Sequence, residues 1–293
     1  MNEIVTIIGP TFFAVVVGYL FGRVTKANMA PLIDISVYVA VPALGFHSMV
    51  TSEIVFVDAT KLWVATLIVM AGSAVLAVVL FAVLRQKHSG LYLPIVFWNS
   101  VNIPLPIIFM AFGAEGAALA ILMYIPGGLI LNSLGVYVAS GEKDIKQGLV
   151  VMFKTPLMYA AVLGLVLNLA HVPVPDVVIG AVELVGRAGV PLMLLILGVS
   201  IGRFRLRQIP LTVAASVLRV WGGFCFGLLA VWLLGLVDLN RAVVLFEATM
   251  PGAVFASVLT AKYRNEEELV SSVVLVTTVM AIAVIPALLY FLA

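Results

Sequence analysis

Long apolar runs alternate with short polar connections along the whole chain. Runs of roughly 20 apolar residues, the length that crosses the hydrocarbon core of a bilayer, are centred near residues 13, 41, 72, 101, 126, 160, 189, 221, 251 and 280. Because lipid offers no partner for backbone groups, each run predicts an α-helix. The pattern therefore predicts an all-α membrane protein with ten transmembrane helices.

Composition agrees with this prediction and limits the function classes. The 293 residues are 63% hydrophobic and 10% charged, with a mean hydropathy of +1.23, so charges are too few to cover a soluble protein of this size. The first run follows no basic segment and precedes no cleavage pattern, so we expect it to stay in the protein. The short connections leave no room for a soluble catalytic domain, so any function must lie within the membrane.

Basic residues predict the orientation. The odd-numbered connections carry most of them: Arg23, Lys26, Arg85, Lys87, Lys143, Lys146, Lys154, Arg203, Arg205, Arg207, Lys262 and Arg264. The even-numbered connections carry Lys61 and Arg241. The positive-inside rule then places the odd connections in the cytoplasm and both termini on the outer side. It explains the basic inner face without any nucleic-acid partner.

Polar and helix-breaking residues interrupt the fourth run, in the segment NSVNIPLPI. The interrupting residues are Asn99, Ser100, Asn102, Pro104 and Pro106. Proline removes a backbone donor and clashes with the preceding turn, so this segment predicts a helix that opens at membrane depth. Such openings normally line a polar cavity.

The ninth run contains a comparable interruption, formed by Thr249, Met250, Pro251 and Gly252. Paired interrupted helices in the two halves of a membrane protein point to the binding site of a transporter. The two halves also share motifs. PTFFAVVVG in the first run matches PLMYAAVLG in the sixth, and AVPAL in the second matches GVPLM in the seventh.

These matches predict two repeats, residues 1–146 and 147–293. Each repeat would hold five spans, an odd number, so the second must enter the membrane in the opposite sense to the first. Inverted repeats of this kind let a transporter alternate between outward-facing and inward-facing forms. A duplicated channel is the alternative interpretation of the same repeat.

The interrupted segments offer groups suited to an anion. Half-helices that begin at the two interruptions would point their free N–H groups and positive dipole ends at the crossing point. The side chains of Asn99, Asn102, Ser100 and Thr249 could add donors to a carboxylate. Alternatively, the amides repair backbone groups that the prolines leave unpaired. Asn132 in the fifth run would face the crossing or hydrogen-bond to another helix.

Glu247 lies one turn before Pro251. A bare carboxylate beside an anion site would repel the substrate unless a proton or a cation accompanies it, so coupling to H⁺ or Na⁺ is one hypothesis. Carbonyls near Pro251 would complete a sodium site with Glu247. The alternative is a structural ion pair with Arg219 or Arg187. Arg187 also follows Glu183 by one turn, which predicts a local pair between them.

The chain is not predicted to be an enzyme or an ATP-driven pump. It contains no HExxH, GxSxG or Walker-type phosphate loop. Cys225, the single cysteine, excludes an intramolecular disulfide and a thiolate metal site. No cofactor is expected beyond a coupling ion.

Several motifs together resemble the auxin efflux carrier family, in its bacterial malonate and malate permease-like members. They are NSVNIPLPI, TPLMYAAVLGL, PLMLLILGVSI and MPGAVFASVLTAKY followed by RNEEEL. The resemblance implies crossover helices 4 and 9, a scaffold from helices 1, 2, 6 and 7, and a transport domain from helices 3–5 and 8–10. It also implies a homodimer through the scaffold and a fold related to bile acid:sodium symporters.

In this family the substrate carboxylate is bound by residues that match Asn99, Pro106 and Pro251, with Asn102 and Thr249 as neighbours. Pro104 departs from the family pattern, which often has glycine there. By similarity to the sodium symporters, Glu247 would help to bind sodium. We therefore expect a secondary carrier of a small organic anion in a bacterial inner membrane, working by an elevator-like motion. A gated anion channel and a membrane-embedded sensor are the alternatives.

Overall fold

The computed structural model describes residues 2–25, 29–53, 56–85, 87–140, 156–201 and 206–292. Within these ranges the structure is helical, apart from one isolated β-bridge, as the apolar runs predict. The predicted repeat boundary at residue 146 lies outside them. So do six of the basic residues used for orientation, namely Lys26, Lys143, Lys146, Lys154, Arg203 and Arg205.

Six helices in the described ranges are long and apolar enough to cross a membrane. They are Ala30–Thr51, Phe56–Leu84, Pro104–Ala139, Asp176–Val199, Ile209–Leu234 and Glu267–Leu292. Phe12–Val24 and Pro156–Leu169 are apolar but shorter. The runs centred near residues 101 and 251 are broken by non-helical backbone, as predicted. Ten spans in two inverted repeats remain a prediction.

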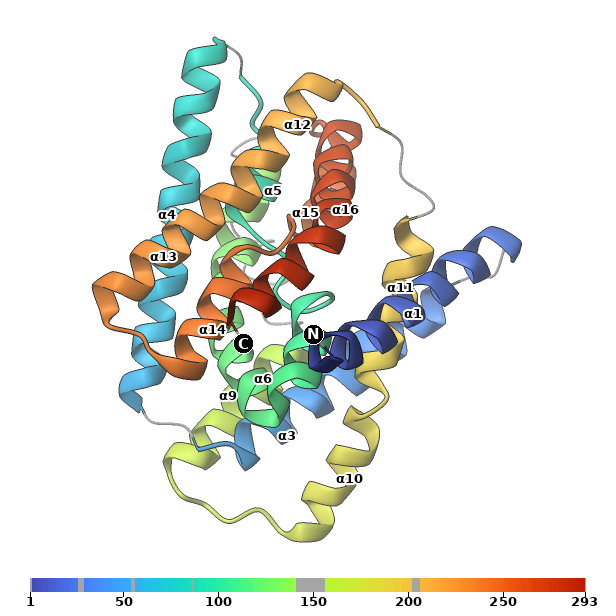
Figure 1. Cartoon of the computed structure of the whole chain (residues 1–293), viewed down its shortest axis with the longest axis vertical. Coiled ribbons are helices and arrows are strands. Elements are labelled where there is room, and N and C mark those ends of the chain that lie inside the picture. The colour runs from blue at the N-terminus through green and yellow to red at the C-terminus, as the bar shows by residue number, and fades with distance from the viewer. Residues whose placement is uncertain are drawn as a thin grey trace. The chain divides into compact units, whose positions relative to one another are not determined.

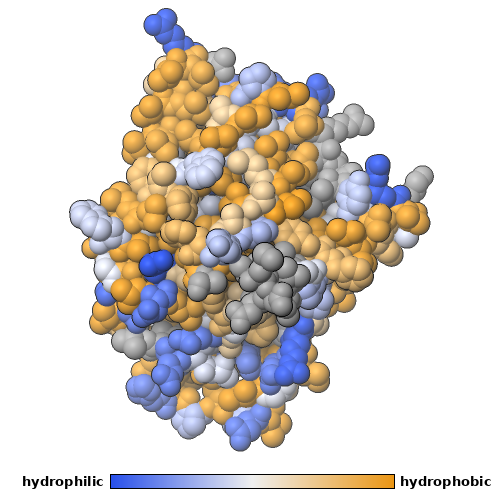
Figure 2. Space-filling view, viewed as in Figure 1, coloured by the Kyte–Doolittle hydropathy of each residue, from blue (hydrophilic) through white to orange (hydrophobic). Residues whose placement is uncertain are grey.

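Many large apolar side chains lie on the outside of these helices. Val75 and Trp232, for example, are 60% and 76% exposed. Hydrophobic residues cover much of the surface visible in Figure 2, including α4 (Phe56–Leu84) and α13 (Gly223–Leu234). Water would penalise this surface heavily, whereas lipid tails would not, so it fits helices embedded in a bilayer.

Contacts divide the chain into two units, which we describe separately. Unit 1 comprises Met1–Thr60, Val101–Ile125 and Thr155–Arg203. Its helical elements, besides the first part of α6 (Pro104–Ile130), are α1 (Asn2–Val24), α2 (Ala30–Ile35), the π-helical turn η1 (Ser36–Ala40), α3 (Val41–Thr51), α9 (Pro156–Leu169), α10 (Asp176–Gly186) and α11 (Gly189–Ile201).

Glycines bring the helices of unit 1 into close contact. Helices α1 and α11 run side by side (Figure 1). A Cβ on Gly18 would collide with the backbone of Leu195, and a Cβ on Gly198 would collide with the backbone of Val15. Small residues at such positions let two backbones pack directly, which is the usual means of tight helix association in membranes.

Unit 2 comprises Lys61–Ser100, Pro126–Lys154 and Phe204–Ala293. Its elements, besides most of α4 and the end of α6, are α5 (Tyr92–Val96), the π-helical turn η2 (Leu131–Gly135), α7 (Val136–Ala139), α12 (Ile209–Val217), the π-helical turn η3 (Leu218–Gly222), α13, α14 (Asp238–Ala248), α15 (Val254–Tyr263) and α16 (Glu267–Leu292). Elements α12, η3 and α13 form one continuous helix in Figure 1.

Helix α6 contains a sharp internal bend. Gly113 has φ 66° and ψ −160°, a combination that is essentially restricted to glycine. Residues before and after it therefore form two helical segments. The first begins at Pro104, directly after the interruption in the fourth run.

Candidate functional site

Two non-helical segments of unit 2 pair with each other at the interruptions. Trp98 and Gly252 form an antiparallel bridge. The Asn99 N–H donates to the Pro251 carbonyl at 2.8 Å, and the Ala253 N–H donates to the Phe97 carbonyl at 2.9 Å. The structure therefore brings residues 97–100 and 249–253 together, although about 150 residues separate them in sequence.

The sequence of the second segment explains its path. Helix α14 ends at Ala248, and the Thr249 hydroxyl donates back to the Leu245 carbonyl at 2.6 Å. Pro251 has no N–H with which to continue the helix. The Gly252 N–H instead donates to Thr277 Oγ1 of α16 at 3.2 Å.

Gly252 also allows a close approach between the segments. A Cβ at this position would lie 2.8 Å from the Pro94 carbonyl oxygen at the end of α5. Any larger residue would have to push the two segments apart. Helix α15 then begins at Val254, so its positive dipole end follows closely after Gly252.

The predicted residues of the fourth run fall in different units. Asn99 is buried and Ser100 is half-buried, and both belong to unit 2. Asn102, Pro104 and Pro106 belong to unit 1, because the boundary falls between residues 100 and 101.

Pro104 and Pro106 lie in the first turn of α6. Their missing N–H groups would have no partner inside the helix anyway, so the prolines begin this helix without strain. They also remove two of the donors that a helix start normally offers to an anion. The start of α6 is therefore a poorer source of N–H donors than the sequence analysis assumed.

Asn132 lies in the π-helical turn η2 and is buried. Its Nδ2 atom donates to the Gly128 carbonyl of the preceding turn at 2.8 Å. This donor is therefore used within its own helical segment.

Glu247 is fully buried at the end of α14. The indole Nε1–H of Trp98 donates to its Oε2 atom at 2.7 Å. The Ser100 hydroxyl also interacts with this carboxylate. The sequence analysis did not identify Trp98, although a buried indole N–H normally needs an acceptor and Trp98 directly precedes Asn99.

Arg219 is fully buried as well, in the turn η3. Its guanidinium donates to three backbone carbonyls: those of Ile95 at 2.9 Å, Val96 at 3.4 Å, and Ala248. It also lies over the Trp98 ring, 5.5 Å from the centroid. The sequence analysis considered Arg219 only as a partner for Glu247.

The ion pairs in the structure differ from the predicted alternative, in which Glu247 pairs with Arg219 or Arg187. In the described part of the chain, no nitrogen of Arg219 comes within ion-pair distance of Glu247. Arg187 pairs with Glu183 at 2.6 Å on an exposed face, which confirms the predicted local pair. The two buried charges are instead linked through Trp98, whose N–H contacts the acid and whose ring lies under the base.

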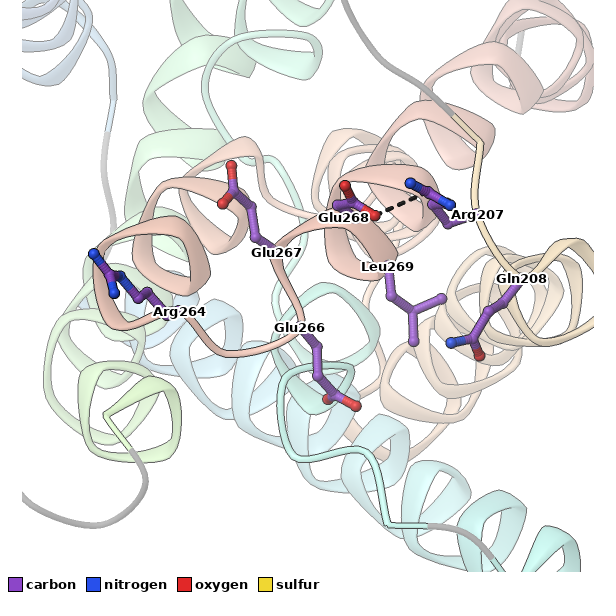
Figure 3. A pocket seen from close by; sticks show the side chains of 7 residues that line it. All are labelled: Arg207, Gln208, Arg264, Glu266, Glu267, Glu268 and Leu269. Atoms are coloured by element: carbon purple, nitrogen blue, oxygen red, sulfur yellow. Dashed lines mark ion pairs between the residues drawn. The ribbon is translucent and has the colours of Figure 1, made fainter.

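A polar pocket of about 530 Å³ lies elsewhere in unit 2, around the RNEEEL loop. Figure 3 shows Arg207 paired with Glu268, at 2.8 Å. Glu266 bonds to His88 at 2.5 Å and to the Gly90 N–H at 2.9 Å. Much of this charge is therefore already paired, so the pocket is a weaker candidate than the paired segments.

Comparison with known proteins agrees with a membrane transport protein. Residues 3–290 match the family described as "Membrane transport protein". An uncharacterized transporter of Methanocaldococcus jannaschii is 26% identical over 92% of this chain and 93% of its own length. An uncharacterized transporter of Methanothermobacter thermautotrophicus is 27% identical over 93% of each chain.

The relatives are named as transporters, and the family match covers nearly the whole chain. An enzymatic function is therefore not indicated, in agreement with the sequence analysis. The resemblance to the auxin efflux carriers is likewise confirmed at the level of the family. The chain belongs to the membrane transport protein family and is a multi-pass membrane transporter.

Proposed function

We propose that this transporter is a secondary carrier of a small organic anion, which binds where residues 97–100 pair with residues 249–253. The observation that carries the proposal is this pairing of two interrupted segments beside buried polar side chains. Irregular backbone at membrane depth is tolerated only where protein buries it or where it lines a cavity. Substrate sites of transporters are typically built from such discontinuous helices.

The chemistry at the pairing favours a carboxylate. The positive end of α15 follows Gly252, and the Asn99 amide adds side-chain donors on the facing segment, next to the Ser100 hydroxyl that contacts Glu247. Thr249 would complete the site within unit 2, whereas Asn102 and Pro106, which the resemblance also assigns to it, belong to unit 1. The family resemblance favours a small acid such as malonate or malate.

Glu247 would couple transport to an ion. A second negative charge beside a carboxylate substrate is costly in a low-dielectric site unless a proton or a cation is taken up with it. Trp98 and Ser100, both in the segment 97–100 of the substrate site, donate to the Glu247 carboxylate. Uptake of a proton or a cation by Glu247 would therefore raise the affinity for the substrate, and substrate binding would favour that uptake.

Alternating access would follow from two inverted five-helix repeats, 1–146 and 147–293. In the arrangement that the resemblance implies, helices 3–5 and 8–10 move as a transport domain against a scaffold of helices 1, 2, 6 and 7. The scaffold would also form the homodimer. We place the carrier in a bacterial inner membrane with both termini outside, on the distribution of basic residues.

Uptake of labelled malonate, malate and indole-acetate into proteoliposomes tests the proposal, with imposed proton or sodium gradients. We expect saturable uptake by the wild type, loss of uptake in Asn99→Asp because of charge repulsion, and loss of gradient dependence in Glu247→Gln. Glu183→Gln is the matched control, because Glu183 pairs with Arg187 on an exposed face. Non-saturating flux would favour a channel, and absence of flux in folded protein would favour a sensor.

A further inference from the structure

The interruptions leave carbonyl oxygens without helical partners. A helix end exposes its last carbonyls, and an interruption inside the membrane does so where no water is available. The carbonyls of Ile95 and Val96 lie at the end of α5, and that of Ala248 lies at the end of α14. All three point their negative ends at one place in unit 2, because one guanidinium donates hydrogen bonds to them all.

Carbonyls freed by broken helices are a common binding site for a coupling cation in transporters. A desolvated monovalent cation takes carbonyl oxygens and the faces of aromatic rings as ligands. The surroundings of the Arg219 guanidinium are of this kind, with three carbonyls and the Trp98 ring. The positive charge among these carbonyls is therefore supplied by the side chain of Arg219.

The local structure holds the guanidinium there. Arg219 lies in a π-helical turn, a feature that often occurs at functional sites. Gly223, one turn later, has no side chain, and a Cβ there would collide with the Ala248 carbonyl and with the guanidinium itself. The planar fork of arginine can reach several carbonyls at once, which the single ammonium of lysine does less well.

We infer that Arg219 is a positioning residue that acts as a tethered cation, taking the place of a free coupling cation at the carbonyls of Ile95, Val96 and Ala248. The inference rests on the proposed function and narrows it. A sodium ion cannot use carbonyls that the guanidinium already occupies. Arg219 keeps the two interrupted segments paired, and Glu247 is left to carry the coupling alone, by taking up a proton.

Thermal unfolding of purified protein tests the inference without any transport assay. The wild type should unfold at the same temperature in sodium, potassium and choline chloride. Arg219→Ala should unfold at a lower temperature than the wild type. Addition of about 10 mM methylguanidinium should raise the unfolding temperature of this variant by several degrees, because a ligand that binds the folded state stabilises it by mass action. Urea at the same concentration should not restore it.

Two further variants provide the controls. Arg187→Ala removes an exposed guanidinium that pairs with Glu183, so methylguanidinium should have no effect on it. Arg219→Lys keeps the charge and Arg219→Met keeps much of the volume, so the lysine variant should be the more stable of the two. This comparison decides the matter even if Arg219→Ala does not fold.

The inference is overturned by saturable stabilisation of the wild type by sodium, by equal stability of the lysine and methionine variants, or by restoration with urea as well as methylguanidinium. A different result would contradict the proposed function, namely the absence of saturable organic-anion uptake by the wild type. If the wild type transported no organic anion but the unfolding tests gave the expected results, the inference about Arg219 would stand and the carrier proposal would fail.

Discussion

The two units hold their helices together by different means. In unit 1, α1 and α11 meet backbone to backbone at Gly18 and Gly198, and the ion pair between Glu183 and Arg187 lies on an exposed face. In unit 2, Arg219 and Glu247 are the two charged side chains that are buried among the described residues. The contact between α1 and α11 in unit 1 depends on shape, whereas the buried charges of unit 2 belong to a polar network that a proton or a substrate can change.

This difference predicts different consequences of substitution. Glycine contacts between helices leave no space for rearrangement, so changes there should reduce folding. A network of buried donors and acceptors should tolerate small changes in volume but respond strongly to a lost partner. Substitutions in unit 1 should therefore affect stability first, and substitutions in unit 2 should affect transport first.

The largest effect is expected for Gly198→Val in unit 1. The nearest atoms to a Cβ at this position are backbone atoms of α1, which cannot move aside as a side chain can. We expect a loss of about 3 kcal/mol or more in the free energy of unfolding. Thermal unfolding in detergent and the yield of monodisperse protein measure it.

Gly180→Val is the matched control for this change. Gly180 lies in α10 of the same unit, and a Cβ there would meet no atom within 4 Å. The control should therefore fold almost as the wild type does. If both valine variants unfolded alike, the close contact between α1 and α11 would not be what stabilises unit 1.

A smaller loss of stability and a large loss of transport are expected for Gly223→Ala. The added methyl group would meet the Ala248 carbonyl and the Arg219 guanidinium, so it should displace the arginine from its carbonyls. We expect about 1–3 kcal/mol of destabilisation. Gly127→Ala is the control, because the nearest atom to its Cβ would be Thr66 Cγ2, at an ordinary contact distance of 3.7 Å.

Transport rates per folded molecule separate these two glycines. Gly223→Ala should transport slowly even when its folded fraction is taken into account, and Gly127→Ala should transport at the wild-type rate. Normal transport by Gly223→Ala would argue against a role for the Arg219 contacts in the carrier cycle.

Trp98→Phe should have a still smaller effect on stability, because it keeps most of the aromatic ring beneath Arg219. It removes the N–H that donates to Glu247, and a buried acceptor left with fewer partners costs about 1–3 kcal/mol, here towards the lower end because Ser100 remains nearby. Uptake should therefore change its dependence on the proton gradient. Trp232→Phe, at an exposed position, should change neither property.

Residue patterns predicted the general architecture well because hydrophobic length and proline have local effects. The apolar runs predicted the helical structure, and prolines predicted both interruptions, together with asparagines near residue 101 and with glycine near residue 251. The local pair of Glu183 and Arg187 followed from its spacing of one helical turn.

The contacts inside the site could not be predicted because they join distant segments. The hydrogen bond from Trp98 to Glu247 depends on the pairing of two interruptions, and so do the hydrogen bonds that Arg219 donates to three carbonyls. A charged residue in an apolar run signals a partner but does not say whether that partner is a carboxylate or the backbone. The assignment of Asn102 and Asn99 to different units also has no local signal.

The smallest effect is expected for the exposed pair of unit 1. A double-mutant cycle with Glu183→Gln and Arg187→Met should give a coupling energy of about 0.3–0.5 kcal/mol, the range of an exposed pair one helical turn apart. Transport should stay at the wild-type rate in all three variants. A coupling energy several times larger, or a loss of transport, would mean that charge also matters in unit 1, and the contrast between the units would then be a difference of degree.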